Sequence, residues 1–202
     1  MASLLVHTCC GPCATGCVEH WRQEGFEVTS FWYNPNIHPF SEHQKRLQTL
    51  QEFFLKNNTP LLVSEGYDVV SYFRAVVGHE DERCQHCFRL RLTATASVAK
   101  ERGFEAFTTT LLISPYQNQE LLKQIGEEIA QREGLQFISE DMRPCYGDSR
   151  RISQELDLYR QKYCGCIYSE WERFSKKKRR VPPQGESART PPASSGPPQP
   201  SR

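Results

Sequence analysis

Thiol groups are the first candidates for chemistry in this chain, because nine of its 202 residues are cysteines. Seven of them fall in three short motifs, a C-C-G-P-C turn, a C-x-x-C pair and a C-x-C pair, formed by Cys9, Cys10 and Cys13, by Cys84 and Cys87, and by Cys164 and Cys166. An odd number of cysteines does not fit complete disulfide pairing, and no secretion signal is visible, so a reducing compartment is expected. Metal or redox chemistry is therefore the better interpretation of the motifs.

The number of thiols decides between kinds of metal site. One structural zinc needs four ligands, whereas the Cys-Cys, C-x-x-C and C-x-C pairs together supply six. An iron–sulfur cluster accepts irregular spacing and thiolates from distant segments, and six thiols leave some over for a second metal. The isolated Cys17 and Cys145 are interpreted differently, as small buried apolar residues.

The elements that must position these thiols alternate between strands and helices. Apolar or β-branched runs predict strands beginning at Leu4 and over residues 26–33, 61–63, 104–112 and 135–138. Helical spacing predicts helices up to Gly25, after an N-cap at Ser41, over 66–102 with a break at Gly78, over 119–132, and over 153–174 with an interruption at 163–166. The fold class expected is α/β: a Rossmann-like three-layer parallel sheet followed by a helical cysteine segment.

In such a sheet, right-handed crossovers place the loops that follow the strands at the same edge. The loops that meet there would be those holding Cys9 and Cys10, residues 34–39, 114–117 and 141–146. The turn from the first strand into the first helix is where open α/β sheets hold ligands, and this chain places sulfur there instead of a phosphate loop.

Composition limits the remaining possibilities. One catalytic domain is expected over residues 1–175, and residues 176–202, a basic run followed by Pro and Ser, predict a disordered tail. A net charge of +1 gives no overall basic signal, so any nucleic-acid surface would be a local patch. No stretch approaches ~18 apolar residues, which predicts a cytoplasmic protein without membrane contact.

Five segments between Leu4 and Phe174 carry a family resemblance: LLVHTCCGPC, FWYNPNIHPFSEHQKRL, RCQHCFRLRL, FTTTLLISPYQ and LYRQKYCGCIYSE. In this order they resemble the epoxyqueuosine reductases of the QueH type, and the sheet order looks similar to that of the adenine-nucleotide α-hydrolase superfamily. The resemblance implies an oxidoreductase that converts epoxyqueuosine to queuosine at the wobble position of the tRNAs for aspartate, asparagine, histidine and tyrosine, the last step of queuosine biosynthesis. It also implies a [4Fe-4S] cluster, an adjacent mononuclear iron, no cobalamin and an electron donor that the sequence does not identify.

Six thiols match the family pattern and are the expected cluster and metal ligands: Cys9, Cys10, Cys84, Cys87, Cys164 and Cys166. The resemblance implies an aspartate ligand to the single iron where this chain has Cys13, which is therefore included among the metal ligands. A thiolate is a softer ligand than a carboxylate, so this position would alter the second metal site.

Removal of an epoxide oxygen needs two electrons, an acid that accepts the oxygen, and protons. The hypothesis is that the iron polarises the C–O bond while the cluster passes electrons. The loop groups Asp141, Tyr116 and His38 are the candidate proton donors. Each has a simpler interpretation: Asp141 pairs with Arg143, His38 fixes its loop, and Tyr116 packs.

An anticodon base could stack on an aromatic ring, and the candidates are Trp32, Tyr33 and Tyr116. The basic residues near the motifs could contact phosphate: Lys45, Arg46, Arg83, Arg89, Arg91, Arg143, Arg150, Arg151, Arg160 and Lys162. Two other functions remain open, a zinc- or cluster-containing tRNA-binding protein and a tRNA sulfur-transfer enzyme with an ATP site.

Overall fold

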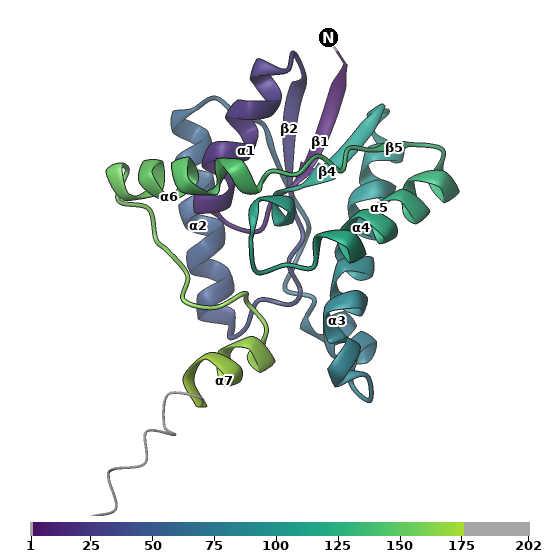
Figure 1. Cartoon of the computed structure of the whole chain (residues 1–202), viewed down its shortest axis with the longest axis vertical. Coiled ribbons are helices and arrows are strands. Elements are labelled where there is room, and N and C mark those ends of the chain that lie inside the picture. Colours follow the sequence, from purple (N-terminus) through teal and green to yellow (C-terminus); the bar gives the residue numbers. More distant parts are fainter. Residues whose placement is uncertain (1, 176–202) are drawn as a thin grey trace, which may run out of the picture.

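The computed structural model describes residues 2–175, which form a five-stranded, wholly parallel sheet with helices on both faces (Figure 1). The strand order is β3-β2-β1-β4-β5, with bounds Ser3–His7 for β1, Glu27–Trp32 for β2, Leu61–Val63 for β3, Ala106–Thr109 for β4 and Gln136–Phe137 for β5. This confirms the expected α/β fold class. The tail predicted over residues 176–202 lies outside the described residues, so the domain boundary at residue 175 stays a prediction.

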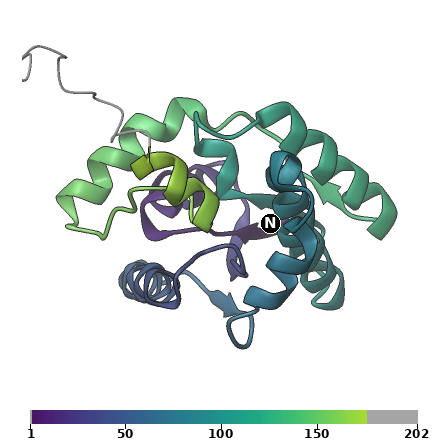
Figure 2. The same ribbon diagram turned by 90° about the horizontal axis from the view of Figure 1, so that it is seen from below.

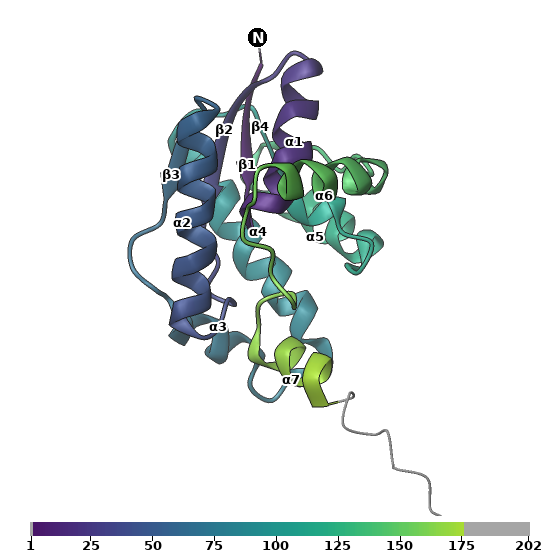
Figure 3. The ribbon, with the colours of Figure 1, turned by 90° about the vertical axis from the view of Figure 1, so that its left-hand side faces the viewer.

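Two helical layers enclose the sheet, with α2 and the α4–α5 pair on opposite sides of it (Figure 2). The first layer consists of α1 (Gly11–Gln23), α2 (Phe40–Lys56) and α6 (Tyr146–Glu155), and the second of α3 (Val69–Val76), α4 (Arg83–Glu101) and α5 (Gln119–Glu133). The last helix, α7 (Ile167–Ser175), lies beyond the carboxyl ends of the strands (Figure 3). None of the described helices combines the length and the apolar character needed to cross a bilayer.

The central strand β1 is apolar on both faces because both are covered. Leu4, Leu5 and Val6 are fully buried, as expected for a strand inside a parallel sheet. The chain leaves β1 toward β2 on one side and later crosses to β4 on the other, so the topology reverses beside β1. Ligands of open α/β sheets bind at such a switch point, and the Cys9-Cys10 turn follows β1 there.

Two predicted boundaries in the sheet layers are wrong. The fourth strand ends at Thr109 instead of continuing to Leu112, because the Thr109 hydroxyl accepts a hydrogen bond from the Leu111 amide (3.1 Å) and the chain turns into the 3-10 helix η2 (Thr110–Ile113). Helix α2 begins at Phe40 directly after Pro39, so Ser41 is inside the helix and not its N-cap.

The C-terminal region also differs from its prediction. Helix α6 begins at Tyr146, and residues 156–166 form neither helix nor strand. Ser149 attaches α6 to α1, since its hydroxyl lies 2.9 Å from the Thr15 hydroxyl and accepts from the Gly16 amide (3.3 Å). Because the buried residues of α6 are serines, its sequence lacks the regularly spaced apolar residues that predict a helix. The irregular segment then brings Cys164 and Cys166 to the carboxyl edge of the sheet.

Candidate metal centre

Three thiols form a compact group at the start of α1, which we call the thiol trio. The sulfur atoms of Cys9, Cys10 and Cys13 lie within 4.8 Å of one another. Cys10 is the N-cap of α1, and its sulfur accepts a hydrogen bond from the Cys13 amide (3.4 Å). A helix N-terminus stabilises negative charge, so this position favours the thiolate, which is the form of cysteine that binds metal.

Polar groups from distant segments also face the trio. The Thr110 hydroxyl donates to the Cys9 sulfur (3.3 Å), and the Gln161 side-chain amide donates to the Cys10 sulfur (2.9 Å). Hydrogen bonds from the Cys10 and Cys13 thiols lower the pKa of Cys9, and burial raises the pKa of Cys10. Within the trio, the surroundings of Cys9 therefore favour the thiolate most.

Four further thiols form a second group, the thiol quartet, which consists of Cys84 and Cys87 on α4 and Cys164 and Cys166 before α7. Cys87 and Cys166 are buried in one small cluster. Burial raises the pKa of Cys87 to about 12, and the nearby Cys164 and Cys166 contribute in the same direction. Two segments nearly eighty residues apart in the sequence thus bring thiols near one another, although no three of the quartet's sulfur atoms all lie within 4.8 Å of one another.

A buried cation lies behind both groups. Arg91 is 1% exposed, and its guanidinium donates to Asn34 Oδ1 (2.7 Å), to His7 Nε2 (3.3 Å) and toward the Cys87 sulfur (3.8 Å). Its charge also contributes to the lowered pKa of Cys9. Among the described residues no carboxylate pairs with Arg91. A buried cation without an anion is costly, so this site is suited to an anionic metal–thiolate group.

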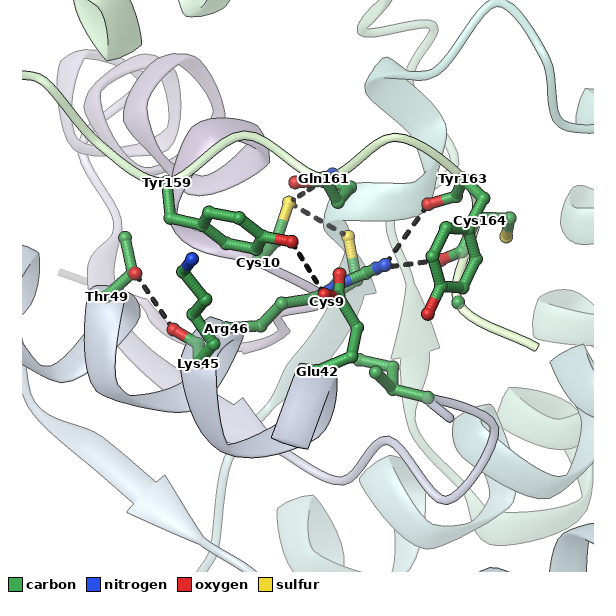
Figure 4. A network of polar contacts seen from close by, with 12 residues as sticks. Cys9, Cys10, Glu42, Lys45, Arg46, Thr49, Tyr159, Gln161, Tyr163 and Cys164 are labelled. Carbon is green, nitrogen blue, oxygen red and sulfur yellow. Dashed lines mark hydrogen bonds and ion pairs between the residues drawn. The ribbon is translucent and has the colours of Figure 1, made fainter. Parts of the chain in front are cut away.

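A second buried arginine holds the irregular segment in place (Figure 4). Arg46 pairs with Glu42 (2.7 Å) and donates to the carbonyl oxygens of Cys164 (2.9 Å) and Tyr163 (3.2 Å). The Tyr159 hydroxyl donates to the other oxygen of Glu42 (2.6 Å). Helix α2 therefore fixes the backbone from which Cys164 projects.

A groove of about 1270 Å³ opens over the thiols. Cys13 of the trio and Cys164 of the quartet both line it, so both groups face the same space. Its walls carry aromatic and basic side chains, including Tyr116, Tyr146, Tyr159, Tyr163, Arg150, Arg160, Lys162 and Arg173. This volume exceeds that of a typical small-molecule site of ~300–1,000 Å³, and the groove is large enough for a nucleotide with its neighbours.

Comparison with known proteins shows the family to which this chain belongs. The model of the family described as epoxyqueuosine reductase QueH matches residues 4–172. The chain belongs to the QueH family. Epoxyqueuosine reductase QueH of Dehalococcoides mccartyi is 43% identical over 173 residues, which are 86% of this chain and 95% of that protein. The protein of the same name from Thermotoga maritima is 36% identical over 187 residues, covering 87% and 94%.

A solved structure shares the fold of this QueH-family chain at low sequence identity. It is described as the predicted subunit of a tRNA methyltransferase from Methanocaldococcus jannaschii. The two chains superpose with a TM-score of 0.53 at 13% identity, over 77% of this chain and 76% of the other. The likeness shows a common α/β architecture.

The three expected proton donors occupy different surroundings in this QueH-family chain. Tyr116 is 82% exposed and lines the groove. Asp141 pairs with Arg143 (2.6 Å), and hydrogen bonds from Arg143 lower the pKa of Asp141 to about 2. His38 is buried, with Nε2 3.1 Å from the Pro35 carbonyl and Nδ1 accepting from the Ile167 amide (3.3 Å). The contacts of Asp141 and His38 match their simpler interpretations.

Two of the aromatic candidates lie away from the groove. Trp32 is 1% exposed and donates to His43 Nε2 (3.2 Å), and the Tyr33 hydroxyl donates to Asp68 (2.9 Å). Tyr116 instead meets Tyr146 edge-to-face, with ring centroids 6.3 Å apart. The groove thus offers a pair of tyrosine rings, one from the loop before α5 and one from the first residue of α6.

The ten basic candidates divide by burial and pairing. Arg46 and Arg91 are buried, so they are not available to phosphate. Arg83, Arg89, Arg143 and Arg151 pair with carboxylates, and Lys45 lies over the Tyr159 ring at 4.1 Å. Three of the candidates line the groove: Arg150, Arg160 and Lys162.

Of the isolated cysteines, Cys17 is buried as predicted, whereas Cys145 is not fully buried. Cys17 is 1% exposed in the main core, and Cys145 is half-buried against it. Several contributors to the site carried no signal of their own in the sequence. Gln161, Thr110 and Gln117, whose amide donates to the Cys164 sulfur (3.4 Å), fall inside the family motifs, but only the fold shows that they face sulfur.

Proposed function

We propose that this protein reduces epoxyqueuosine to queuosine at the wobble position of tRNA. The observation that carries the proposal is that the thiol trio and the thiol quartet each contribute a cysteine, Cys13 and Cys164, to the lining of one groove. Membership of a family whose curated relatives are named epoxyqueuosine reductases supports it. The tRNAs for aspartate, asparagine, histidine and tyrosine as substrates, a separate electron donor and a cytoplasmic location belong to the same proposal.

The donor sets fit two different metal groups. Four cysteines are the usual ligand set of a [4Fe-4S] cluster, so the quartet Cys84, Cys87, Cys164 and Cys166 would hold it. The trio Cys9, Cys10 and Cys13 would hold a single iron. Bound there, these groups would supply two electrons and a Lewis acid, and no cobalamin would be needed.

The protein's own residues prepare these positions. The N-terminus of α1, the Thr110 hydroxyl and the Gln161 amide direct hydrogen-bond donors at the trio, which favours bound thiolates over free thiols. Arg91 places a positive charge beside Cys87 of the quartet, and this charge also favours the thiolate of Cys9 in the trio. Burial of Cys9, Cys10, Cys87 and Cys166 limits the access of water.

The groove binds the modified base. The rings of Tyr116 and Tyr146 provide a stacking surface for a base turned out of the anticodon loop. Arg150, Arg160 and Lys162 provide positive charge for the flanking phosphates. Of the three candidate proton donors, Tyr116 is the one that lines this groove, and we assign it the proton transfer to the departing oxygen.

The test is an anaerobic reaction of iron- and sulfide-reconstituted protein with tRNA that contains epoxyqueuosine and a low-potential reductant. Digestion and mass analysis should show queuosine for the wild type and none for Cys84→Ser. Cys17→Ala is the matched control, because Cys17 is a core thiol outside both groups, and it should keep its turnover. Unchanged epoxide in an iron-replete wild-type sample contradicts the proposal, and a thiolated product would indicate sulfur transfer instead.

A further inference from the structure

A second set of side chains of metal-ligand type lies in the turn before α4 and on the first turn of α4, and it includes none of the seven thiols. One ligand atom each of His79, Glu82 and His86 lies within 4.8 Å of the other two. The two imidazole rings are in contact, with centroids 4.9 Å apart. Throughout residues 2–175, none of these three side chains has a hydrogen-bond or ion-pair partner that would occupy its ligand atom.

The backbone brings these side chains together within eight consecutive residues. Gly78 has φ +83°, a left-handed conformation that favours glycine, and its amide donates to Glu80 Oε1 (3.1 Å). The Glu82 amide then donates to the His79 carbonyl (3.0 Å), which closes the 3-10 turn η1 (Glu80–Glu82). Glu82 and His86 are four residues apart at the start of α4 and therefore lie on one face of the helix.

We propose that His79, Glu82 and His86 bind a divalent transition metal of the Zn²⁺ type. Two imidazoles and one carboxylate are a common protein ligand set for such ions and leave a position for water. Ligand atoms ~2.1 Å from a tetrahedral metal lie about 3.4 Å apart. The exposed His79 and Glu82 and the half-buried His86, whose ligand atoms lie within 4.8 Å of one another, therefore need only small rotamer changes to reach it. The neighbouring Glu80 and Asp81 add negative charge that attracts a cation.

The bound ion would fix the first turn of α4. Arg83 already ties this turn to α7 through its pair with Glu172 (2.6 Å), and Cys84 and Cys87 project from the same turn. A metal joining the preceding loop to the helix at His86 would hold the quartet's C-x-x-C pair in place. The site itself does not depend on the proposed reaction, because its ligands are separate from all seven thiols.

The test uses the iron- and sulfide-loaded protein, whose thiols are occupied, with Zn²⁺ as the probe. After dialysis, metal analysis should show one additional zinc per chain. Zinc-edge X-ray absorption should show nitrogen and oxygen ligands at ~2.0–2.1 Å and no sulfur at ~2.3 Å. Hydrogen exchange of the amides of residues 83–87 should slow when zinc is added.

The variant is the double change His79→Ala and His86→Ala, which alters partly exposed side chains. It should bind zinc at least ~100-fold more weakly, since loss of even an indirect partner of a metal costs about 10–100-fold. His20→Ala is the matched control, because His20 pairs with Glu140 (3.0 Å) and belongs to no group of three ligands. This variant should leave zinc affinity unchanged. No retained zinc, a zinc–sulfur shell, or equal binding by the double variant overturns the proposal.

Discussion

Replacement of Arg91 by methionine would test whether the site is built for an anionic metal group. The guanidinium lies 3.8 Å from the Cys87 sulfur, and at an effective dielectric constant of about 20 a thiolate there would attract it by about 4 kcal/mol. At ~1.4 kcal/mol per factor of ten, Arg91→Met should release iron up to about 1,000-fold more readily. Arg91→Lys keeps the charge but loses the bonds to Asn34 and His7, and it should be intermediate.

The assay is the rate of iron release to a ferrous chelator under anaerobic conditions, combined with urea unfolding of the metal-free protein. Without metal, Arg91→Met should change the free energy of unfolding by less than about 2 kcal/mol, because lost hydrogen bonds are offset by removal of an unpaired buried cation. Arg46→Met is the matched control. It leaves Glu42 without its cationic partner and should destabilise even the metal-free protein by about 3–5 kcal/mol.

Wild-type iron retention by Arg91→Met would refute this reasoning. So would a large loss of stability in the metal-free variant, since Arg91 would then be a structural residue only.

Three further predictions concern other parts of the molecule. Cys13→Asp should retain the single iron and turnover, whereas Cys13→Ala should lose both; equal behaviour of the two variants would remove Cys13 from the ligands. Tyr116→Ala should raise KM for tRNA, by a factor that corresponds to the ~1–3 kcal/mol of binding free energy in a lost stacking contact. Tyr116→Phe should lower kcat alone, and an unchanged kcat in this variant would exclude the proton-donor role. Burial lowers the pKa of His7 to about 3 and the pKa of His43 to about 4. Between these values and about pH 6.5 both side chains are neutral in the folded protein and take up a proton when it unfolds. The free energy of unfolding should therefore decrease as the pH is lowered from about 6.5 to about 4. His43→Gln should reduce this slope by up to ~1.4 kcal/mol per pH unit in urea titrations, and an unchanged slope would contradict the assignment.

The sheet could be predicted because its determinants are local. The apolar run Leu4-Leu5-Val6 is typical of a strand covered on both faces, and strand–helix alternation then fixes which loops share an edge. The end of β4 could not be predicted, since it depends on how the Thr109 hydroxyl bonds in the folded chain. Helix α6 could not be predicted for a similar reason, because it is attached to α1 by the hydrogen bonds of Ser149 and not by an apolar face.

The candidate site, too, could be predicted from the sequence only in part. Thiol spacing and the motifs identified the cysteines, because sulfur at a sheet edge is chemically distinctive. The arginines could not be sorted from sequence, and Arg46 and Arg91 were expected at a phosphate surface. Their burial depends on partners far away in the chain: Glu42 and the Cys164 carbonyl for Arg46, and Asn34 and His7 for Arg91.

The central claim is that two thiol groups on one groove hold two different iron centres. Mössbauer spectroscopy of ⁵⁷Fe-reconstituted wild type, Cys13→Ala and Cys84→Ser measures this directly, since a [4Fe-4S] cluster and a single iron give separate signals. We predict both signals in the wild type, the cluster signal alone in Cys13→Ala, and loss of the cluster signal in Cys84→Ser. A wild-type spectrum without a cluster, or a cluster that survives Cys84→Ser and disappears in Cys13→Ala, would contradict the account.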